Sequence, residues 1–151
     1  MPDCLFCSIA VGEIPSWTIF ESERYLAFLT PFPNTPGFTV VIPKHHLPSA
    51  VLSLPKEEYA ALFETAREVS ELLERSLECK RVGLVAEGMG IDHAHVKLIP
   101  MHGIPDGPWE PMLSIEHPFS ERYVGYLTTH DGPRMADAEL LKIQERIVRA
   151  R

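Results

Sequence analysis

Two histidines and a lysine alternate with apolar residues in the second half of the chain, in the stretch His93-Ala94-His95-Val96-Lys97. Successive side chains of a β-strand point to opposite faces, so His93, His95 and Lys97 are expected to share one face while the apolar residues face the core. Ionisable groups in such a row are costly unless they are solvated or used. The row is therefore a candidate reactive site, and the alternative is a strand with one solvated face.

The lysine decides which chemistry this row favours. Two histidines at this spacing often meet a metal, but a protonated amine is no ligand and repels a cation. The same amine attracts phosphate, and a neutral imidazole beside it can attack phosphorus. Histidine suits this role because its usual pKa of about 6.5 leaves a nitrogen lone pair at neutral pH. The residues favour phosphoryl or nucleotidyl transfer through His95, with Lys97 acting as a fixed positive charge.

The cysteines form a second group with chemical potential. Cys4 and Cys7 make a C-x-x-C pair and Cys79 stands alone, so the odd count cannot form a complete disulfide set. In a reducing compartment such a pair binds a metal or does redox work. Thioredoxin-type chemistry is disfavoured because the pair does not follow a βαβ pattern. The remaining alternatives are a metal site and two small buried residues in the first turn.

Periodicity predicts the elements that position these groups. Residues 55–77 carry apolar side chains at helical spacing and charged ones on the opposite face, which predicts an amphipathic helix of about six turns. A short helical turn is expected over 6–12, and a final helix over 137–150. Strands are expected over the ranges 17–20, 25–29, 38–42, 82–86, 94–99 and 123–128. This order predicts an α+β fold: an antiparallel sheet meander with one long helix packed on it, followed by a C-terminal extension with a short strand and a terminal helix.

Length and charge exclude several classes of protein. The chain has 151 residues, 45% of them hydrophobic, which suits one folded domain. Its 14 basic and 21 acidic residues give a net charge of −7 without a basic stripe, so binding to long nucleic acid is not expected. No apolar run has the roughly 20 residues that cross a bilayer. No secretory signal is visible, and we expect a cytoplasmic protein.

Several short motifs together resemble one known family. They are the opening Cys4-Leu5-Phe6-Cys7-Ser8-Ile9-Ala10-Val11-Gly12-Glu13-Ile14-Pro15, the segments Tyr25-Leu26-Ala27-Phe28, Thr35-Pro36-Gly37 and Val41-Ile42-Pro43-Lys44-His45-His46, and the His-x-His-x-Lys strand. At this spacing the sequence resembles the histidine-triad (HIT) family of nucleotide hydrolases and transferases. The match covers about residues 4–101. It implies a HIT-like domain over 1–101, with residues 102–151 as an extension packed on the same domain.

The resemblance implies catalytic and nucleotide-binding roles. His95 corresponds to the nucleophile that forms a transient nucleotidyl-histidine, and His93 to the histidine that steadies it. Phe6, Ile9 and Phe28 match positions that line the nucleobase pocket, although Ile9 suits a plain core position equally well. Thr30 stands where the family usually has an acidic residue that contacts the ribose.

The resemblance also implies a metal and a partner. Many bacterial members hold a structural zinc ion with four side chains whose counterparts are Cys4, Cys7, His46 and His93. Such a Cys₂His₂ set is a closed tetrahedral zinc site. His45 is expected at the surface, and no organic cofactor is implied. We also expect a homodimer in which residues 108–111 and 123–127 reach across to the partner.

Departures from the family pattern concern the substrate more than the phosphorus chemistry. Lys97 replaces the third histidine, and Ala86 stands where an asparagine is common. The glycine-containing loop over 88–92 is about four residues shorter than the family's loop. Asp92 is expected either to orient His93 or to be an exposed loop carboxylate.

Two functions of different classes follow. The first is an enzyme in which His95 attacks the α-phosphorus of a nucleotide anhydride, phosphoramidate or ester. Because Lys97 would stay charged, good leaving groups such as those of anhydrides should be favoured. The second is a nucleotide-binding or scaffold protein of the same fold with little or no turnover.

Overall fold

The computed structural model describes residues 4–108, 119, 121–123, 125 and 134–149. The chain divides into two compact units, Met1–Pro108 and Trp109–Arg151. The first unit holds the sheet and every candidate site residue. In the second, helix α3 (Asp137–Arg149) lies where a final helix is expected. Of the strand expected over 123–128, the structure describes only residues 123 and 125, which are not in a strand, and residues 109–111 expected at a dimer contact lie outside the described residues. The packing of 102–151 on the first unit stays a prediction.

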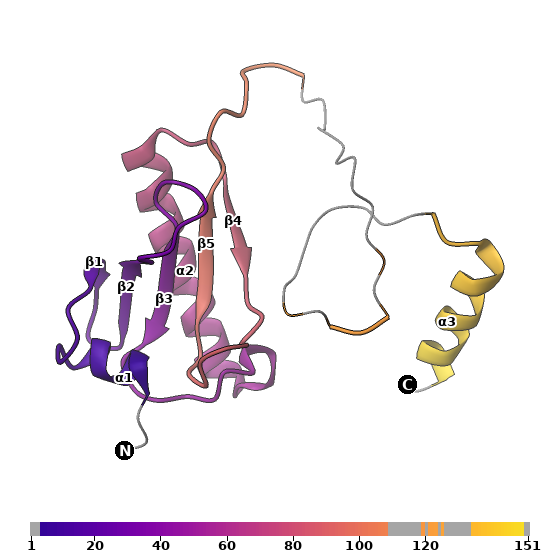
Figure 1. The fold of residues 1–151 in the computed structure, drawn as a ribbon, viewed down its shortest axis with the longest axis horizontal. Helices are drawn as coiled ribbons and strands as arrows, with labels where there is room; N and C mark the ends of the chain where they lie inside the picture. The colour runs from indigo at the N-terminus through magenta and orange to yellow at the C-terminus, as the bar shows by residue number, and fades with distance from the viewer. Residues whose placement is uncertain (1–3, 109–118, 120, 124, 126–133, 150–151) are drawn as a thin grey trace. The chain divides into compact units, whose positions relative to one another are not determined.

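The sheet has five antiparallel strands in the order β1-β2-β3-β5-β4. Its strands are β1 (Trp17–Glu21), β2 (Tyr25–Leu29), β3 (Thr39–Pro43), β4 (Val82–Val85) and β5 (Val96–Pro100). The first three form the expected meander. After β3 the chain crosses to the far edge as β4, and β5 then fills the place between β3 and β4 (Figure 1). The row that ends in Lys97 therefore leads into an interior strand.

Helix α2 (Lys56–Leu77) covers one face of the sheet, as the helical periodicity predicts (Figure 1). Pro55 occupies its N-cap position and acidic residues fill its first turn, where the helix dipole favours them. Glu78 ends it in the left-handed conformation, with φ of 53°. The apolar face of α2 and the sheet form the larger core. Its buried members include Val41, Leu62, Ala66, Val69, Leu73, Ala94, Val96 and Leu98.

The opposite face of the sheet carries a smaller core under helix α1 (Leu5–Ala10). Phe6 of α1 packs there with Leu26, Phe28, Val40 and Ile42 of the strands. We call these five residues the α1-side cluster. The short helix is thereby fixed over the ends of β2 and β3.

The strand that carries the signature begins later than expected. β5 starts at Val96, whereas periodicity predicts a strand from residue 94. The register that pairs Val41 with Val96 would set Pro43 opposite Ala94, and proline has no amide hydrogen for the ladder. The amide of Ala94 instead donates to the Leu47 carbonyl at 2.8 Å. The two histidines therefore lie in the approach to β5.

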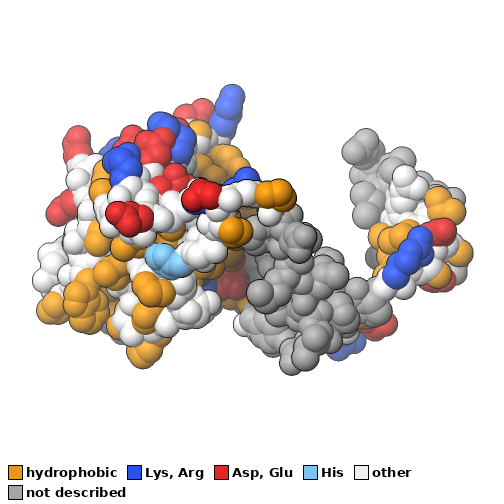
Figure 2. Space-filling view, turned by 90° about the horizontal axis from the view of Figure 1, so that it is seen from above, with side chains coloured by type: hydrophobic (Ala, Val, Ile, Leu, Met, Phe, Trp, Pro, Cys, Tyr) orange, Lys and Arg blue, Asp and Glu red, His pale blue; other side chains and the backbone are white. Residues whose placement is uncertain are grey.

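Charge on the sheet-containing unit is mixed in sign. On the face that Figure 2 shows, lysine and arginine side chains lie among aspartate and glutamate side chains. This agrees with the absence of a basic stripe in the sequence. Within the part of the chain that the structure describes, no helix has the length and apolar character to cross a membrane.

Candidate functional site

Four side chains from separate parts of the first unit converge beside α1. Cys4 precedes α1, Cys7 lies on its first turn, His46 follows β3 and His93 precedes β5. Their sulfur and nitrogen atoms all lie within 4.8 Å of one another. The Nδ1 atom of His93 is 3.4 Å from Cys4 Sγ and 3.5 Å from Cys7 Sγ, and His46 Nδ1 is 3.5 Å from Cys7 Sγ. These four groups are close enough to hold one metal ion.

The protein fixes the orientation of the buried ligand. The Nε2–H group of His93 donates to the Pro43 carbonyl at 2.8 Å, so Nδ1 carries the lone pair that faces the sulfurs. His93 is 0% exposed, and this burial lowers the pKa of its imidazole. A metal-ligating histidine ordinarily has its other ring nitrogen held in this way. Burial and the adjacent Cys4 raise the pKa of the Cys7 thiol, an effect that a bound cation reverses.

His95 lies beside the cluster with one ring nitrogen already engaged. Its Nδ1–H group donates to the backbone carbonyl of His93 at 2.7 Å, so Nε2 carries the lone pair. The ring is buried, and desolvation lowers its pKa, with the Lys97 charge lowering it further. The hydrogen bond to the carbonyl acts in the opposite direction. A neutral imidazole with an available Nε2 atom is the form required of a nucleophile.

The predicted division of faces is present despite the late start of β5. Ala94 and Val96 belong to the core under α2. The rings of His93 and His95 contact Phe6 edge-on instead, with centroids 5.8 Å and 5.3 Å away. Both histidines therefore lie on the α1 side, and the row is largely buried.

The aromatic residues expected in a nucleobase pocket also lie on the α1 side. Phe6 and Phe28 meet edge-on with their centroids 5.8 Å apart. Ile9 packs against the same cluster from α1. Phe6 and Ile9 lie one helical turn apart on α1, and this turn sets both against the cluster, with Phe6 also contacting the ring of His95.

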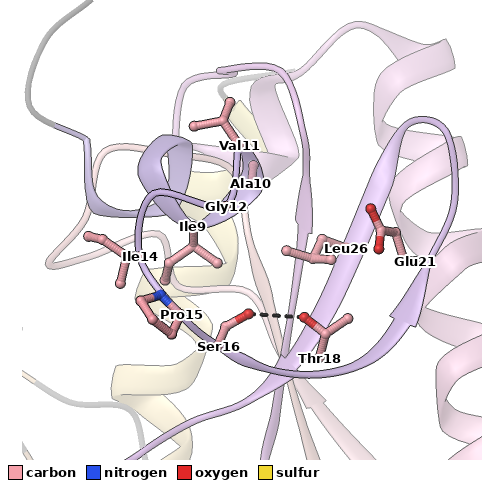
Figure 3. Close-up of a pocket in the computed structure, with 10 residues that line it drawn as sticks. All are labelled: Ile9, Ala10, Val11, Gly12, Ile14, Pro15, Ser16, Thr18, Glu21 and Leu26. Carbon is pink, nitrogen blue, oxygen red and sulfur yellow. Dashed lines mark hydrogen bonds between the residues drawn. The ribbon is translucent and has the colours of Figure 1, made fainter.

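A hollow of about 350 Å³ opens beside these residues, between α1, the loop after it and β1 (Figure 3). Its walls include Ile9 and Leu26, which also border or belong to the α1-side cluster. Ser16 and Thr18 line it with hydroxyl groups that hydrogen-bond to each other at 3.0 Å, and Glu21 adds a carboxylate. Phe6, Phe28 and Thr30 are not among the residues that line it. The wall therefore combines apolar side chains with hydroxyl groups and one carboxylate.

Thr30 lies just beyond the end of β2, and its hydroxyl oxygen accepts a hydrogen bond from the Phe32 amide at 3.3 Å. The group that stands at the expected ribose position is therefore engaged with its own loop. It presents a small neutral hydroxyl where the family usually has a carboxylate.

Lys97 has a partner that sequence reasoning missed. Its ammonium forms an ion pair with the carboxylate of Glu87, and the two side chains are 28% and 15% exposed. Glu87 follows β4, in which Val85 pairs with Lys97. The register between β4 and β5 could have revealed this partner. Val85 lies opposite Lys97 on the same face of the sheet, and Glu87, two residues after Val85, points to that face as well. Lys97 is therefore not an isolated cation.

Two further sequence expectations have definite outcomes. Asp92 is exposed, and its Oδ1 atom accepts a hydrogen bond from the Ser49 amide at 3.0 Å, which lowers the pKa of its carboxyl group. No hydrogen bond joins it to His93 among the described residues, so it anchors a loop. His45 is exposed, as expected, and its Nε2 atom lies 3.7 Å from a carboxylate oxygen of Glu58.

An open antiparallel sheet with one long helix, and two histidines set against α1, define the class of the protein. The family model described as the HIT domain matches residues 11–106, and the chain belongs to the HIT family. Among its relatives is Protein hit of Bacillus subtilis, 34% identical over 109 residues that cover 70% of this chain and 75% of the relative. The crystal structure of SMU.412c from Streptococcus mutans has a TM-score of 0.66 and 28% identity, and the match covers 99% of this chain and 86% of that one.

Two other relatives have names that state an activity. Adenosine 5′-monophosphoramidase hnt1 of Schizosaccharomyces pombe is 31% identical over 99 residues, 64% of this chain and 73% of the relative. Adenylylsulfatase HINT3 of Arabidopsis thaliana is 29% identical over 103 residues, 65% of this chain and 52% of the relative. The family of this chain thus includes hydrolases of nucleotide derivatives.

Proposed function

We propose that the protein hydrolyses a nucleotide anhydride, phosphoramidate or ester at its α-phosphorus through His95. The observation that carries this proposal is the state of the His95 ring. Its Nδ1–H group is held by the His93 carbonyl at 2.7 Å, and its Nε2 atom keeps a lone pair beside the aromatic cluster. The relatives named for phosphoramidate and phosphosulfate cleavage support the same class of substrate.

The proposed reaction has two displacements at phosphorus. In the first, the Nε2 lone pair of His95 forms an N–P bond while the bond from phosphorus to the leaving group breaks, and the leaving group departs with that electron pair. In the second, water forms a new P–O bond and loses a proton, while the P–N electron pair returns to Nε2. The products are a nucleoside monophosphate and the released leaving group. The His93 carbonyl stabilises the imidazolium character that His95 gains in the first step.

The proposed nucleoside site is the α1 side of the sheet. Phe6 and Phe28 offer aromatic surface next to His95, and Ile9 connects that surface to the hollow. A volume of about 350 Å³ is at the lower end of the range for small-ligand sites. With Thr30 in place of an acidic residue, the ribose contact is expected to be weaker than in the usual family site.

We propose zinc as the metal of the Cys4, Cys7, His46 and His93 cluster. Zinc bonds of about 2.3 Å to sulfur and 2.0–2.1 Å to nitrogen place tetrahedral S and N ligands about 3.6 Å apart. The three sulfur–nitrogen distances of 3.4–3.5 Å fit this value. Four protein ligands leave no open position, so the ion would have a structural role and would take no part in the displacements at phosphorus.

The second candidate function is nucleotide binding without turnover. One observation favours it: the ammonium of Lys97 forms an ion pair with Glu87. The third signature position therefore has neither an imidazole to donate a proton nor an unbalanced positive charge. Such a protein would contact the nucleoside through the same aromatic residues as the proposed enzyme.

The test is to trap the covalent intermediate. The wild-type protein is mixed with a fluorogenic adenosine phosphoramidate or a dinucleoside polyphosphate, quenched in alkali and analysed by peptide mass spectrometry. A nucleotidyl adduct on His95 is expected, and His95→Ala should lack it. His45→Ala, which changes an exposed histidine, is the matched control and should form the adduct normally. If nucleotide raises the melting temperature but neither product nor adduct forms, the protein binds nucleotide without turnover and the hydrolase proposal is wrong.

A further inference from the structure

The ion pair between Glu87 and Lys97 leaves the proposed phosphate site without a net charge. Lys97 contributes one positive charge and Glu87 one negative charge, and the two side chains form an ion pair. Both members of the pair are largely buried, so water screens them less than a surface pair. A phosphate group that reaches Lys97 thus meets a cation whose charge is already balanced.

The sheet register places this pair on the reactive side. Lys97 pairs with Val40 on β3 and with Val85 on β4. Val40 belongs to the α1-side cluster with Phe28, so Lys97 emerges on the face where His95 contacts Phe6.

We propose that Glu87 is a specificity-determining positioning residue, which holds Lys97 on the His95 face and balances its charge so that dianionic phosphate monoesters bind weakly. This inference rests on the proposed function. The α-phosphate of an anhydride, ester or phosphoramidate carries one negative charge, whereas a monophosphate product carries nearly two above pH 7. An unbalanced lysine would hold the product more tightly than the substrate. Glu87 therefore favours product release and discriminates against free monophosphates.

The experiment measures binding by calorimetry at pH 8, with adenosine 5′-monophosphate as the dianion and its methyl ester as the monoanion. Glu87→Gln should tighten binding of the dianion by about tenfold, a typical effect of one charged hydrogen bond, and that of the monoanion by less. Glu87→Asp, which keeps the charge, should stay near wild type. Glu68→Gln makes the same change of charge on the exposed side of α2 and should leave both affinities unchanged.

A double-mutant cycle shows whether Glu87 acts through Lys97. In a Lys97→Met background, Glu87→Gln should change the affinity for the dianion by less than about twofold. A gain that persists there would overturn the proposal, because Glu87 would then repel the ligand directly. An unchanged affinity for the dianion in both Glu87→Gln and Glu87→Ala would overturn it as well. Circular dichroism and melting curves check that each variant is folded.

These binding experiments can fail independently of the test of the proposed function. Turnover and a His95 adduct without the charge effect would retain the enzyme and reject the role of Glu87. The charge effect without turnover would retain the phosphate site and reject the hydrolase.

Discussion

At the scale of single residues, the backbone carbonyl of His93 determines which nitrogen of His95 carries the lone pair. It accepts the Nδ1–H hydrogen bond at 2.7 Å, which leaves Nε2 as the atom that attacks phosphorus in the proposed mechanism. The proposed nucleophile is thus oriented by a main-chain atom. The side chain of His93 is directed to the cysteines and to Pro43.

Replacing the proposed nucleophile should separate chemistry from binding. His95→Ala is expected to lower kcat by at least about 10³-fold, because no other described side chain offers an unprotonated nitrogen at that place. Nucleotide should still raise the melting temperature, since Phe6 and Phe28 are unchanged. Steady-state kinetics and thermal shift on the same preparation check both. Residual turnover within tenfold of wild type would assign the chemistry to another group.

The charge at position 97 should matter most when the leaving group is good. The ammonium of Lys97 can stabilise the charge that develops on a leaving group, and a good leaving group needs no added proton. Lys97→Met is expected to cost about 1–3 kcal/mol in kcat/KM with anhydrides. Because this variant leaves the Glu87 carboxylate without its partner, it is compared with the double variant Lys97→Met/Glu87→Gln as well as with the wild type. Equal activity of all three proteins across leaving groups would show that Lys97 has no part in the reaction.

At the scale of elements, α1 is held by side chains on two sides. Phe6 packs into the α1-side cluster, and Cys4 and Cys7 face His46 and His93. A helix of six residues has little stability of its own, so these attachments keep it in place.

Removing the metal should therefore loosen α1. Chelation is expected to lower the melting temperature, by about 2–4 °C for each kcal/mol of lost stability, and to raise KM for nucleotide because Phe6 moves with the helix. Cys4→Ser should reproduce both effects, whereas His45→Ala should show neither. Elemental analysis of protein purified without added metal should find about one equivalent of zinc. A metal-free protein with an unchanged melting temperature would contradict the assignment.

The long helix should contribute stability without touching the site. Leu62 is 0% exposed in the core between α2 and the sheet. Leu62→Ala is expected to cost about 2–5 kcal/mol in the free energy of unfolding, and Leu62→Met much less. Urea unfolding measures the cost, while KM of the folded variant should stay unchanged. A shift in KM as large as that of Cys4→Ser would show that α2 positions the site.

Elements with strong local signals could be predicted from the sequence. Helix α2 has long periodicity and charged ends, and the meander strands have β-branched runs between turns. The start of β5 was predicted two residues early, because the missing amide of Pro43 matters only once the register with β3 is known. Glu87 was missed for the same reason, since its relation to Lys97 depends on the β4–β5 pairing. Of the four residues that lie close enough to hold a metal ion, Cys4 and Cys7 are candidates from their C-x-x-C spacing alone. His46 and His93 are identified only through the resemblance, because they lie far from that pair in the chain.

At the scale of the whole molecule, we expect two chains to associate. The apolar side of α2 is buried on the sheet, so it is not available to a partner. Strand β4 is an edge of the sheet and exposes Leu84, and α3 exposes Leu140, Leu141 and Ile143. Light scattering at micromolar concentration should give twice the 17.0 kDa mass of one chain. A mass of one chain at that concentration would refute the dimer.

The hydrogen bond from His95 to the His93 carbonyl also bears on how freely position 93 can diverge. Every amino acid has a main-chain carbonyl oxygen, so the acceptor that orients the His95 imidazole does not depend on the residue type at position 93. Cysteine, asparagine or serine at position 93 would alter the metal ligands and still present the same acceptor to Nδ1, provided the backbone keeps its path. A substitution at position 93 is therefore expected to change the metal site while the proposed nucleophile keeps its orientation. Aligned sequences would then show variation at 93 beside a constant 95.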